Sequence, residues 1–393
     1  MIRTLLTVLG KEFMETVRDR RSLLSSLVLT PLFGPLLFAG GLSLSMNRAI
    51  TSLDDAIPLA VAGADHAPNL VHFLRQRGFT LTLQDADDAG LRAWIAEDVE
   101  RVVLVVPEAF GTELAAGEPA RLQLYADASN SRAERYARRT EQALQEWSSI
   151  LASLRLQARG ISPLVVQPLV VDQVDLSTPT TRSTLVLGML SYLIVLATLL
   201  GGMYLAIDAT AGERERGSLE SLLTLPVPRA HLIYGKVLAS ALFMTIALVL
   251  VIITSSQAIT YIPLEEIGMS ANFGPAIALG VFVSMLPFTL LGAALLTVVA
   301  SFTRSYKEAQ TWLGAVLVVP TLPILVAGLL DVKAAPGLML IPSMSQHLLI
   351  QGLLRGEPLS ATFLAVSGLS TLTLGVLLTL LAGWLYQRER ILG

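Results

Sequence analysis

The residues best suited to a chemical role form one polar stretch, residues 208–236, which lies between two long apolar runs. Its charges alternate in sign at four consecutive positions: Glu213, Arg214, Glu215 and Arg216. No paired carboxylates for acid–base catalysis and no Ser/His/Asp set can be assembled beside them. The chemistry that this block suits is therefore contact with another surface at the edge of a membrane.

The residues that follow predict a short, ordered helix. Gly217 is followed by Ser218, a residue type that caps helix N-termini. Leu219, Leu222 and Leu223 then form an apolar stripe at i, i+3 and i+4, and two prolines soon after end the helix. A merely solvated charged loop is the alternative interpretation. The glycine, the stripe and the prolines favour an amphipathic turn.

The sequence contains no phosphate-binding loop, no cysteine site and no group of histidines spaced to bind a metal. The pair Gly235–Lys236 has Ala230 where a phosphate-binding loop requires its first glycine, and no strand precedes it. There is no cysteine, which excludes disulfides and thiolate sites. Four histidines are predicted to be surface residues rather than metal ligands: His66, His72, His231 and His347. We expect no catalytic residue, metal or cofactor in this chain.

Composition indicates an integral membrane protein. Of 393 residues, 53% are hydrophobic and only 15% are charged, against about 25% charged in soluble domains. The apolar residues form long blocks. A net charge of −3 gives no indication of a nucleic-acid partner.

Six transmembrane helices are expected. The first covers residues 22–46, is free of charge and is kinked by Pro31 and Pro35. A cleaved signal peptide is the alternative, but its apolar core would be shorter. The five later spans are predicted at 183–207, 232–259, 275–302, 311–330 and 362–386.

The N-terminal residues 1–21 predict an amphipathic helix that lies in the membrane interface. Phe13 belongs to its apolar face, and Lys11 and Arg18 belong to its polar face. An ordinary amphipathic helix packed on protein is the alternative interpretation.

Residues 47–182 have a different composition and predict an α/β domain with a mixed sheet, inserted between spans one and two. Strands are expected at 57–62, 79–83, 102–106, 121–125 and 164–174. Helices are expected at 64–77, 87–97, 107–116 and 131–159. The predicted fold is thus an α-helical polytopic membrane protein that carries one small α/β domain.

The short loops predict an orientation. Basic residues precede span one, occupy the elbow at 208–231, and follow spans four and six. By the positive-inside rule both termini and this elbow are cytoplasmic, and residues 47–182 are extracytoplasmic. Residues 331–360 then lie outside, where Leu338–Pro342 and Leu348–Leu354 predict short re-entrant or interfacial helices.

The spans hold no Asp, Glu, Lys or Arg away from their ends. Ion-coupled carriers keep an ionisable residue within the bilayer, so a self-contained antiporter is disfavoured. Recurring small residues, such as Gly201–Gly202, are expected to serve close helix packing. The elbow is then the best candidate for the place where an outside energy source acts.

The elbow resembles the permeases of the ABC-2 type of ABC transporter. It reads E-R-E-R-G-S-L-E-S-L-L-T-L-P-V-P-R, with Y-G-K soon after, where that family has E-x-E-x-G-T-L-E, then L-L-x-x-P-V and G-K. The opening K-E-F-M-E-T-V-R-D-R-R-S-L-L resembles the first helix of the family. V-V-P-E-A-F-G-T-E-L-A-A-G-E-P-A, residues 105–120, resembles the external domain of its NatB-like, sodium-efflux branch.

This resemblance implies an exporter permease in the bacterial inner membrane, working as a dimer with two ATP-binding cassette subunits that bind ATP and magnesium. It implies an ATPase-coupling contact by seven residues: Glu213, Glu215, Gly217, Leu219, Glu220, Leu222 and Leu223. Sodium is the substrate that the branch name suggests, and a hydrophobic or amphipathic compound is the alternative. Two other functions remain open, a membrane sensor with an external ligand-binding domain and an intramembrane enzyme.

Overall fold

The computed structural model describes residues 2–54, 57–84, 88–98, 101–165, 178–218, 221, 224, 226–330 and 332–387. The chain divides into two compact units. One comprises Met1–Arg48 and Leu176–Gly393, and the other comprises Ala49–Asp175.

Within the described residues, six helices are long and apolar enough to cross a membrane, as the sequence predicts. They are Leu24–Asn47, Val186–Glu215, Arg229–Ile259, Pro275–Ser301, Tyr306–Leu329 and Ala361–Gln387. Their elements are η1 (Leu24–Phe33) with α3 (Gly34–Asp54), α9 (Thr184–Ile207) with η4 (Asp208–Gly212) and α10 (Glu213–Glu215), α12 (Arg229–Ile259), α13 (Pro275–Ser301), α14 (Tyr306–Val316) with α15 (Val318–Leu329), and α17 (Ala361–Gln387).

Small residues let the central spans pack closely. A methyl group at Gly201 of α9 would overlap Ala247 of α12, and one at Gly375 of α17 would lie 3.0 Å from the backbone nitrogen of Leu291 in α13. The core of this unit accordingly lies among α9, α12 and α13. Small residues at contacts between apolar helices are the usual device where lipid and protein are equally apolar.

The two prolines of the first span shape its N-terminal half. Leu24–Phe33 is a π-helix that contains Pro31. Pro35 has no N–H to donate to the carbonyl of Pro31 four residues earlier. The hydroxyl of Thr254 in α12 donates to that carbonyl instead, at 2.9 Å. The prolines are thus tolerated because a neighbouring span supplies the missing donor.

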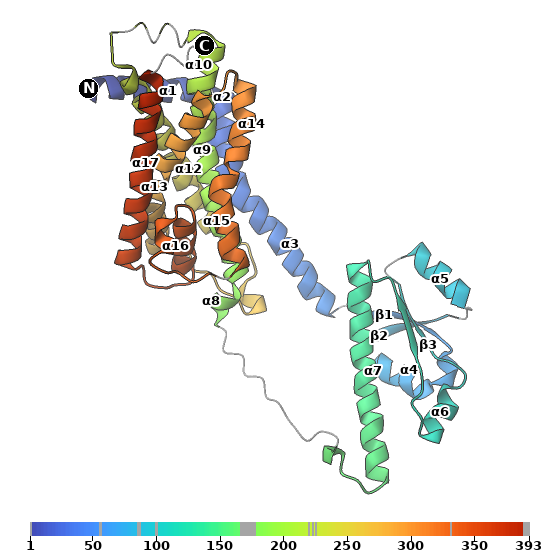
Figure 1. Cartoon of the computed structure of the whole chain (residues 1–393). Coiled ribbons are helices and arrows are strands. Elements are labelled where there is room, and N and C mark those ends of the chain that lie inside the picture. Colours follow the sequence, from blue (N-terminus) through green and yellow to red (C-terminus); the bar gives the residue numbers. More distant parts are fainter. Residues whose placement is uncertain are drawn as a thin grey trace. The chain divides into compact units, whose positions relative to one another are not determined.

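Two further helices lie at one end of the spans. The helix α1 (Ile2–Arg18) runs across that end, near α10, and α2 (Arg20–Leu23) leads from it into the first span (Figure 1). The apolar side chains of α1 pack on α12, with the rings of Phe13 and Phe243 5.3 Å apart.

The segment after span five differs from its prediction in detail. A short turn, η6 (Leu338–Leu340), precedes α16 (Met344–Leu354), which starts four residues earlier than the predicted segment 348–354. Every residue from Met344 to Gln351 is buried, among α9, α13, α15 and α17. Gln346 explains how so polar a helix is buried, because its amide donates to Ser367 and Thr371 of α17.

The second unit contains a small mixed sheet of order β2-β1-β3-β4. Its strands are β1 (Ile57–Ala62), β2 (Phe79–Leu83), β3 (Val102–Val105) and β4 (Gln123–Ala126). The strand β1 pairs in parallel with β2 and β3, and β3 pairs antiparallel with β4. The α-helices that accompany the sheet in the described part of this unit are α4 (Pro68–Gln76), α5 (Asp88–Glu97), α6 (Phe110–Ala116) and α7 (Ser131–Ala158).

The long helix α7 begins where its sequence predicts, because the side chain of Asn130 accepts from the backbone N–H groups of Arg132 and Ala133. Its N-terminal half packs on the sheet through Ala133 and Ala143.

The strand predicted at 164–174 is not found where the chain is described. Pro163–Val165 form a 3₁₀ turn (η3), and residues 166–174 lie outside the described residues.

The remaining elements are short. They are η2 (Ala64–His66), α8 (Pro179–Arg182) and η5 (Glu265–Ile267).

Candidate functional site

Four charged residues meet where α1, α10 and α12 come together, and we call this group the charged corner: Lys11, Glu12, Glu213 and Lys236. Three of them are almost completely inaccessible, with 4% of Glu12, 3% of Glu213 and 2% of Lys236 exposed. Lys11 is only partly buried and closes the group toward solvent.

The ammonium of Lys236 donates two hydrogen bonds within the corner and forms a further ion pair there. It pairs with Glu213, donates to the carbonyl oxygen of Ala209 at 2.5 Å, and lies 3.3 Å from Glu12 Oε1. Lys11 Nζ then contacts the same two carboxylates, at 2.9 Å from Glu213 Oε1 and 3.2 Å from Glu12 Oε1. The corner therefore holds two ammonium and two carboxylate groups, and its charge is balanced.

The corner shifts the pKa of both charged residues of α1. Burial raises the pKa of the Glu12 carboxyl, because desolvation disfavours its charged form more than Lys236 and Lys11 stabilise it. For Lys11, burial alone would lower the pKa, but the carboxylates of Glu12, Glu213 and Glu15 outweigh it, so its pKa is raised. Lys11 therefore stays protonated throughout the physiological range.

A close approach between α1 and α12 makes the corner possible. Gly235 precedes Lys236, and a methyl group in its place would lie 2.7 Å from Val8 Cβ. Without that glycine α1 would be pushed away from α12, and Glu12 would move away from Lys236.

The rest of the alternating block also finds partners within the chain. Arg214 donates to the carbonyl oxygens of Thr303 and Ser301, at 2.7 and 2.9 Å, and so caps the C-terminal end of α13. Glu215 Oε2 accepts from the backbone N–H of Tyr306, the first residue of α14, at 2.7 Å. Consecutive residues of α10 thus connect the end of span two to spans three, four and five.

Three of the seven predicted coupling residues lie within the described part of the chain: Glu213, Glu215 and Gly217. Glu213 faces inward to Lys236, whereas Glu215 is exposed. Gly217 adopts a left-handed backbone with φ of +69°, which favours glycine, and it ends the helical turn. Leu219, Glu220, Leu222 and Leu223 lie outside the described residues.

The interfacial residues predicted on α1 have three different positions. Lys11 belongs to the charged corner, Phe13 packs on Phe243, and Arg18 is exposed at the end of the helix.

Sequence reasoning missed Glu12 and Lys236 as members of this site. Lys236 looked like an ordinary basic flank of an apolar run, and its partners are 23 and more residues away in the chain. A local signal was the glycine before it, because small residues let a second helix approach closely, and Gly235 faces Val8 of α1.

The surface prediction is wrong for one histidine. His347 on α16 is 2% exposed, and its Nδ1 lies 2.5 Å from the hydroxyl oxygen of Ser191 on α9. Its apolar neighbours in the sequence were the signal. No group of three or more potential metal ligands occurs among the described residues.

Comparisons with known proteins agree with the resemblance. Residues 6–390 match the family model described as ABC-2 family transporter protein. The chain is also similar to the ABC transporter permease protein NatB of Bacillus subtilis (strain 168). The two are 24% identical over 383 residues, which cover 91% of this chain and 92% of NatB.

Proposed function

Because the chain belongs to the ABC-2 family of transporters, and is thus a multi-pass permease subunit that works with ATPase partners, we propose that it exports its substrate from the cytoplasm. Two copies would associate with two ATP-binding cassette subunits, and the energy of ATP hydrolysis would reach the spans through the elbow 208–231. ATP and magnesium would be bound by the partner subunits.

The charged corner is the observation that carries this proposal. Breaking a buried ion pair by moving one partner away costs several kcal/mol, so elements joined by one move together. Lys11 and Glu12 on α1, Glu213 on α10 and Lys236 on α12 are joined in this way. A force applied to the elbow or to α1 would therefore displace the ends of spans two and three as one body.

The orientation is part of the proposal. The end of the spans with α1 and α10 carries the basic loops, so it would face the cytoplasm and the ATPases. Residues 47–182 would then be extracytoplasmic. The membrane would be the bacterial inner membrane.

The substrate class follows from what the spans lack. Away from their ends they contain no acidic or basic residue with which to hold a bare cation. A hydrophobic or amphipathic compound is the proposed substrate, and sodium is the alternative.

The decisive test is crosslinking in the native membrane, followed by purification and mass spectrometry. We expect a stoichiometric ATP-binding cassette protein with the native chain. Replacing Leu222 and Leu223 with Asp should remove it, because the apolar stripe of the elbow would no longer fit a groove on the ATPase. Ser221→Asp is the matched control, since it adds a charge on the same segment and keeps both leucines.

Recovery of the chain without any ATPase after crosslinking would contradict the proposal. It would favour the alternative of a membrane sensor, whose external unit binds a ligand without transport. Retention of the ATPase by the double variant would leave the permease assignment intact and move the coupling contact away from the leucine stripe.

A further inference from the structure

The helix α16 packs tightly against two spans. A methyl group at Gly188 of α9 would lie 2.8 Å from Gln351 Nε2, and one at Gly280 of α13 would lie 3.0 Å from Leu353 Cδ1. Small residues at these two positions are what allow the helices to approach so closely. The helix therefore lies against α9 and α13, and its separation from α9 would expose the side chains between them.

His347 lies in the contact between α16 and α9. Only 2% of the residue is exposed, and its Nδ1 lies 2.5 Å from the hydroxyl oxygen of Ser191. That hydroxyl donates to the carbonyl oxygen of Gly188 at 2.9 Å, which uses its single hydrogen. The ring therefore donates through its Nδ1–H, and Nε2 is the nitrogen that would take up a further proton.

The surroundings of Nε2 do not suit a charged ring. This nitrogen is buried and has no hydrogen-bond partner among the described residues. The elements that pack on α16 are chiefly α9, α13, α15, α17 and η6, and their described residues include no Asp, Glu, Lys or Arg. Their titratable side chains are tyrosines, which are uncharged at neutral pH: Tyr192, Tyr204 and Tyr386. A proton added at Nε2 would thus meet no carboxylate on these elements.

The charge that acts on the ring is positive. Arg355 directly follows α16 and lies 3.4 Å from Gln351 Oε1, through its Nη2. The carboxylate beside it, Glu357, is 3.9 Å away and 61% exposed. Burial of the ring, together with the positive charge of Arg355, lowers the pKa of His347 to about 4. The docked arrangement of α16 therefore holds a neutral histidine.

Both ends of α16 have an unusual backbone. Ser343, just before the helix, has a φ of +67° and is the one non-glycine residue with positive φ in the described part of the chain. Such a conformation persists only where surrounding contacts enforce it. Gly356, just after the helix, has a φ of +79°. The docked position of α16 therefore depends on the contacts of its side chains, including that of His347.

We propose that α16 is a pH-sensitive element, which stays docked on α9 while His347 is neutral and separates from it when acid protonates the ring. In the separated state water hydrates the imidazolium and accepts from its Nε2–H. Which compartment sets this pH rests on the proposed orientation, under which it is the outside of the cell. The response to pH itself does not rest on the proposed function.

The direction of the response follows from the two states of the ring. A hydrated histidine has a pKa near 6.5, whereas the pKa of the docked one is about 4. Above pH 6.5 neither state takes up a proton, and docking has its full stability. Between these values only the separated state is protonated, so each unit of acidification favours separation by up to about tenfold. From pH 7.5 to pH 5.0 the equilibrium should shift by up to roughly thirtyfold.

Hydrogen–deuterium exchange of the full chain in lipid nanodiscs tests this proposal at pH 7.5 and pH 5.0. Protection factors are compared, because they divide out the intrinsic pH dependence of exchange. We expect the protection of residues 344–354 to fall by roughly tenfold to thirtyfold at pH 5.0, since a separated helix of 11 residues is only marginally stable in water. The protection of α13 should stay unchanged, which distinguishes undocking from global unfolding.

His347→Gln is the test variant, because glutamine is polar but does not titrate. Its α16 should be equally protected at both pH values. The matched control replaces the other three histidines together, as His66→Gln, His72→Gln and His231→Gln, and should keep the full fall in protection. This control also tests the proposal where His347→Gln does not fold, because His347 is then the single histidine that remains.

Three results would each overturn the proposal. They are equal protection of the native α16 at both pH values, a fall of the native size in His347→Gln, and loss of the fall in the triple histidine variant. The last two would assign the response to another group. None of these results affects the recovery of an ATPase with the chain, so failure of the pH response and failure of the export function can be told apart.

Discussion

At the scale of single residues, Lys236 shows how much depends on one buried charge. Its side chain contacts Glu12, Glu213 and the Ala209 carbonyl, and only 2% of the residue is exposed, which is too little to hydrate a lone charge. A buried charge of this kind is stable only with its partners, so the effect of a substitution at Lys236 depends on Glu12 and Glu213.

Replacing Lys236 alone with Met should strongly destabilise the protein. Glu12 and Glu213 would face each other with Lys11 as their only remaining cation, and removal of one partner of a buried pair costs about 3–5 kcal/mol. The thermal unfolding midpoint of the purified permease should fall clearly. Arg216→Met is the control, because its pair with Asp208 is exposed and contributes about 1 kcal/mol or less.

The double variant Glu213→Gln with Lys236→Met should recover part of the loss. It removes one charge of each sign, so the two substitutions are expected to be non-additive because the residues touch. A double variant that unfolds at the sum of the two single losses would show that the ion pair is not what holds the corner.

At the scale of the elements, the contact of α1 with α12 depends on shape as much as on charge. Gly235 faces Val8 across this contact, whereas Gly10 on α1 has open space where a side chain would lie. The two glycines therefore serve different purposes, although both lie within helices.

We expect Gly235→Ala to loosen α1, because the added methyl group would meet Val8 at 2.7 Å. Gly10→Ala should be neutral or stabilising by up to about 1 kcal/mol, since alanine favours the helix and meets nothing. Limited proteolysis of α1 distinguishes them, with faster cleavage expected only for Gly235→Ala. Equal cleavage rates would argue against the close approach.

Element boundaries were predictable where the sequence states them locally. The bounds of β1 and β2 agree with those predicted from the strand pattern. The helix α13 covers the predicted run of apolar residues and starts at Pro275, a residue type common at the first position of helices. The fifth span begins at Tyr306, five residues before its predicted start. The prediction was late because the first turn of this helix is polar and was not counted with the apolar run. The signal was present: Ser305 caps the helix by accepting from the Glu308 backbone N–H.

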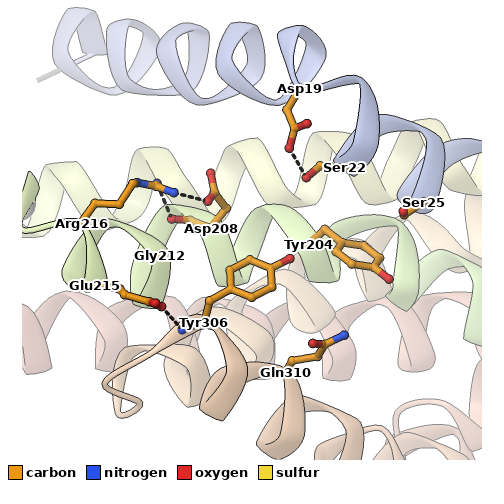
Figure 2. Close-up of a pocket in the computed structure, with 10 residues that line it drawn as sticks. All are labelled: Asp19, Ser22, Ser25, Tyr204, Asp208, Gly212, Glu215, Arg216, Tyr306 and Gln310. Atoms are coloured by element: carbon orange, nitrogen blue, oxygen red, sulfur yellow. Dashed lines mark hydrogen bonds and ion pairs between the residues drawn. The ribbon is translucent and has the colours of Figure 1, made fainter.

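At the scale of the whole molecule, the number of spans followed from composition, but the charged corner did not. Apolar length determines which segments cross a membrane without reference to their neighbours. Lys11 and Glu213 are 202 residues apart, and nothing local in either segment specifies the other. A pocket lined by residues near the ends of spans one, two and five could not be predicted from the sequence for the same reason (Figure 2).

The proposed topology can be tested because the chain has no cysteine. Single cysteines at Ser129 in the α/β unit and at Ser221 in the elbow are both at exposed positions. A membrane-impermeant maleimide applied to intact cells should label Ser129→Cys, and Ser221→Cys should react only after the membrane is opened. Labelling of both in intact cells would place the two positions on one side.

The separation along the chain of the residues in the charged corner sets an order for biosynthesis. Lys11 and Glu12 are made first, and Glu213 and Lys236 follow only after the first span and the entire α/β unit have been translated. At the usual rate of translation that interval is roughly ten to forty seconds. During it Lys11 and Glu12 have neither Glu213 nor Lys236 as a partner, so α1 can dock only once spans two and three have emerged. A chain that stops before span two therefore keeps Lys11 and Glu12 in water, because the residues that bury them have not been made.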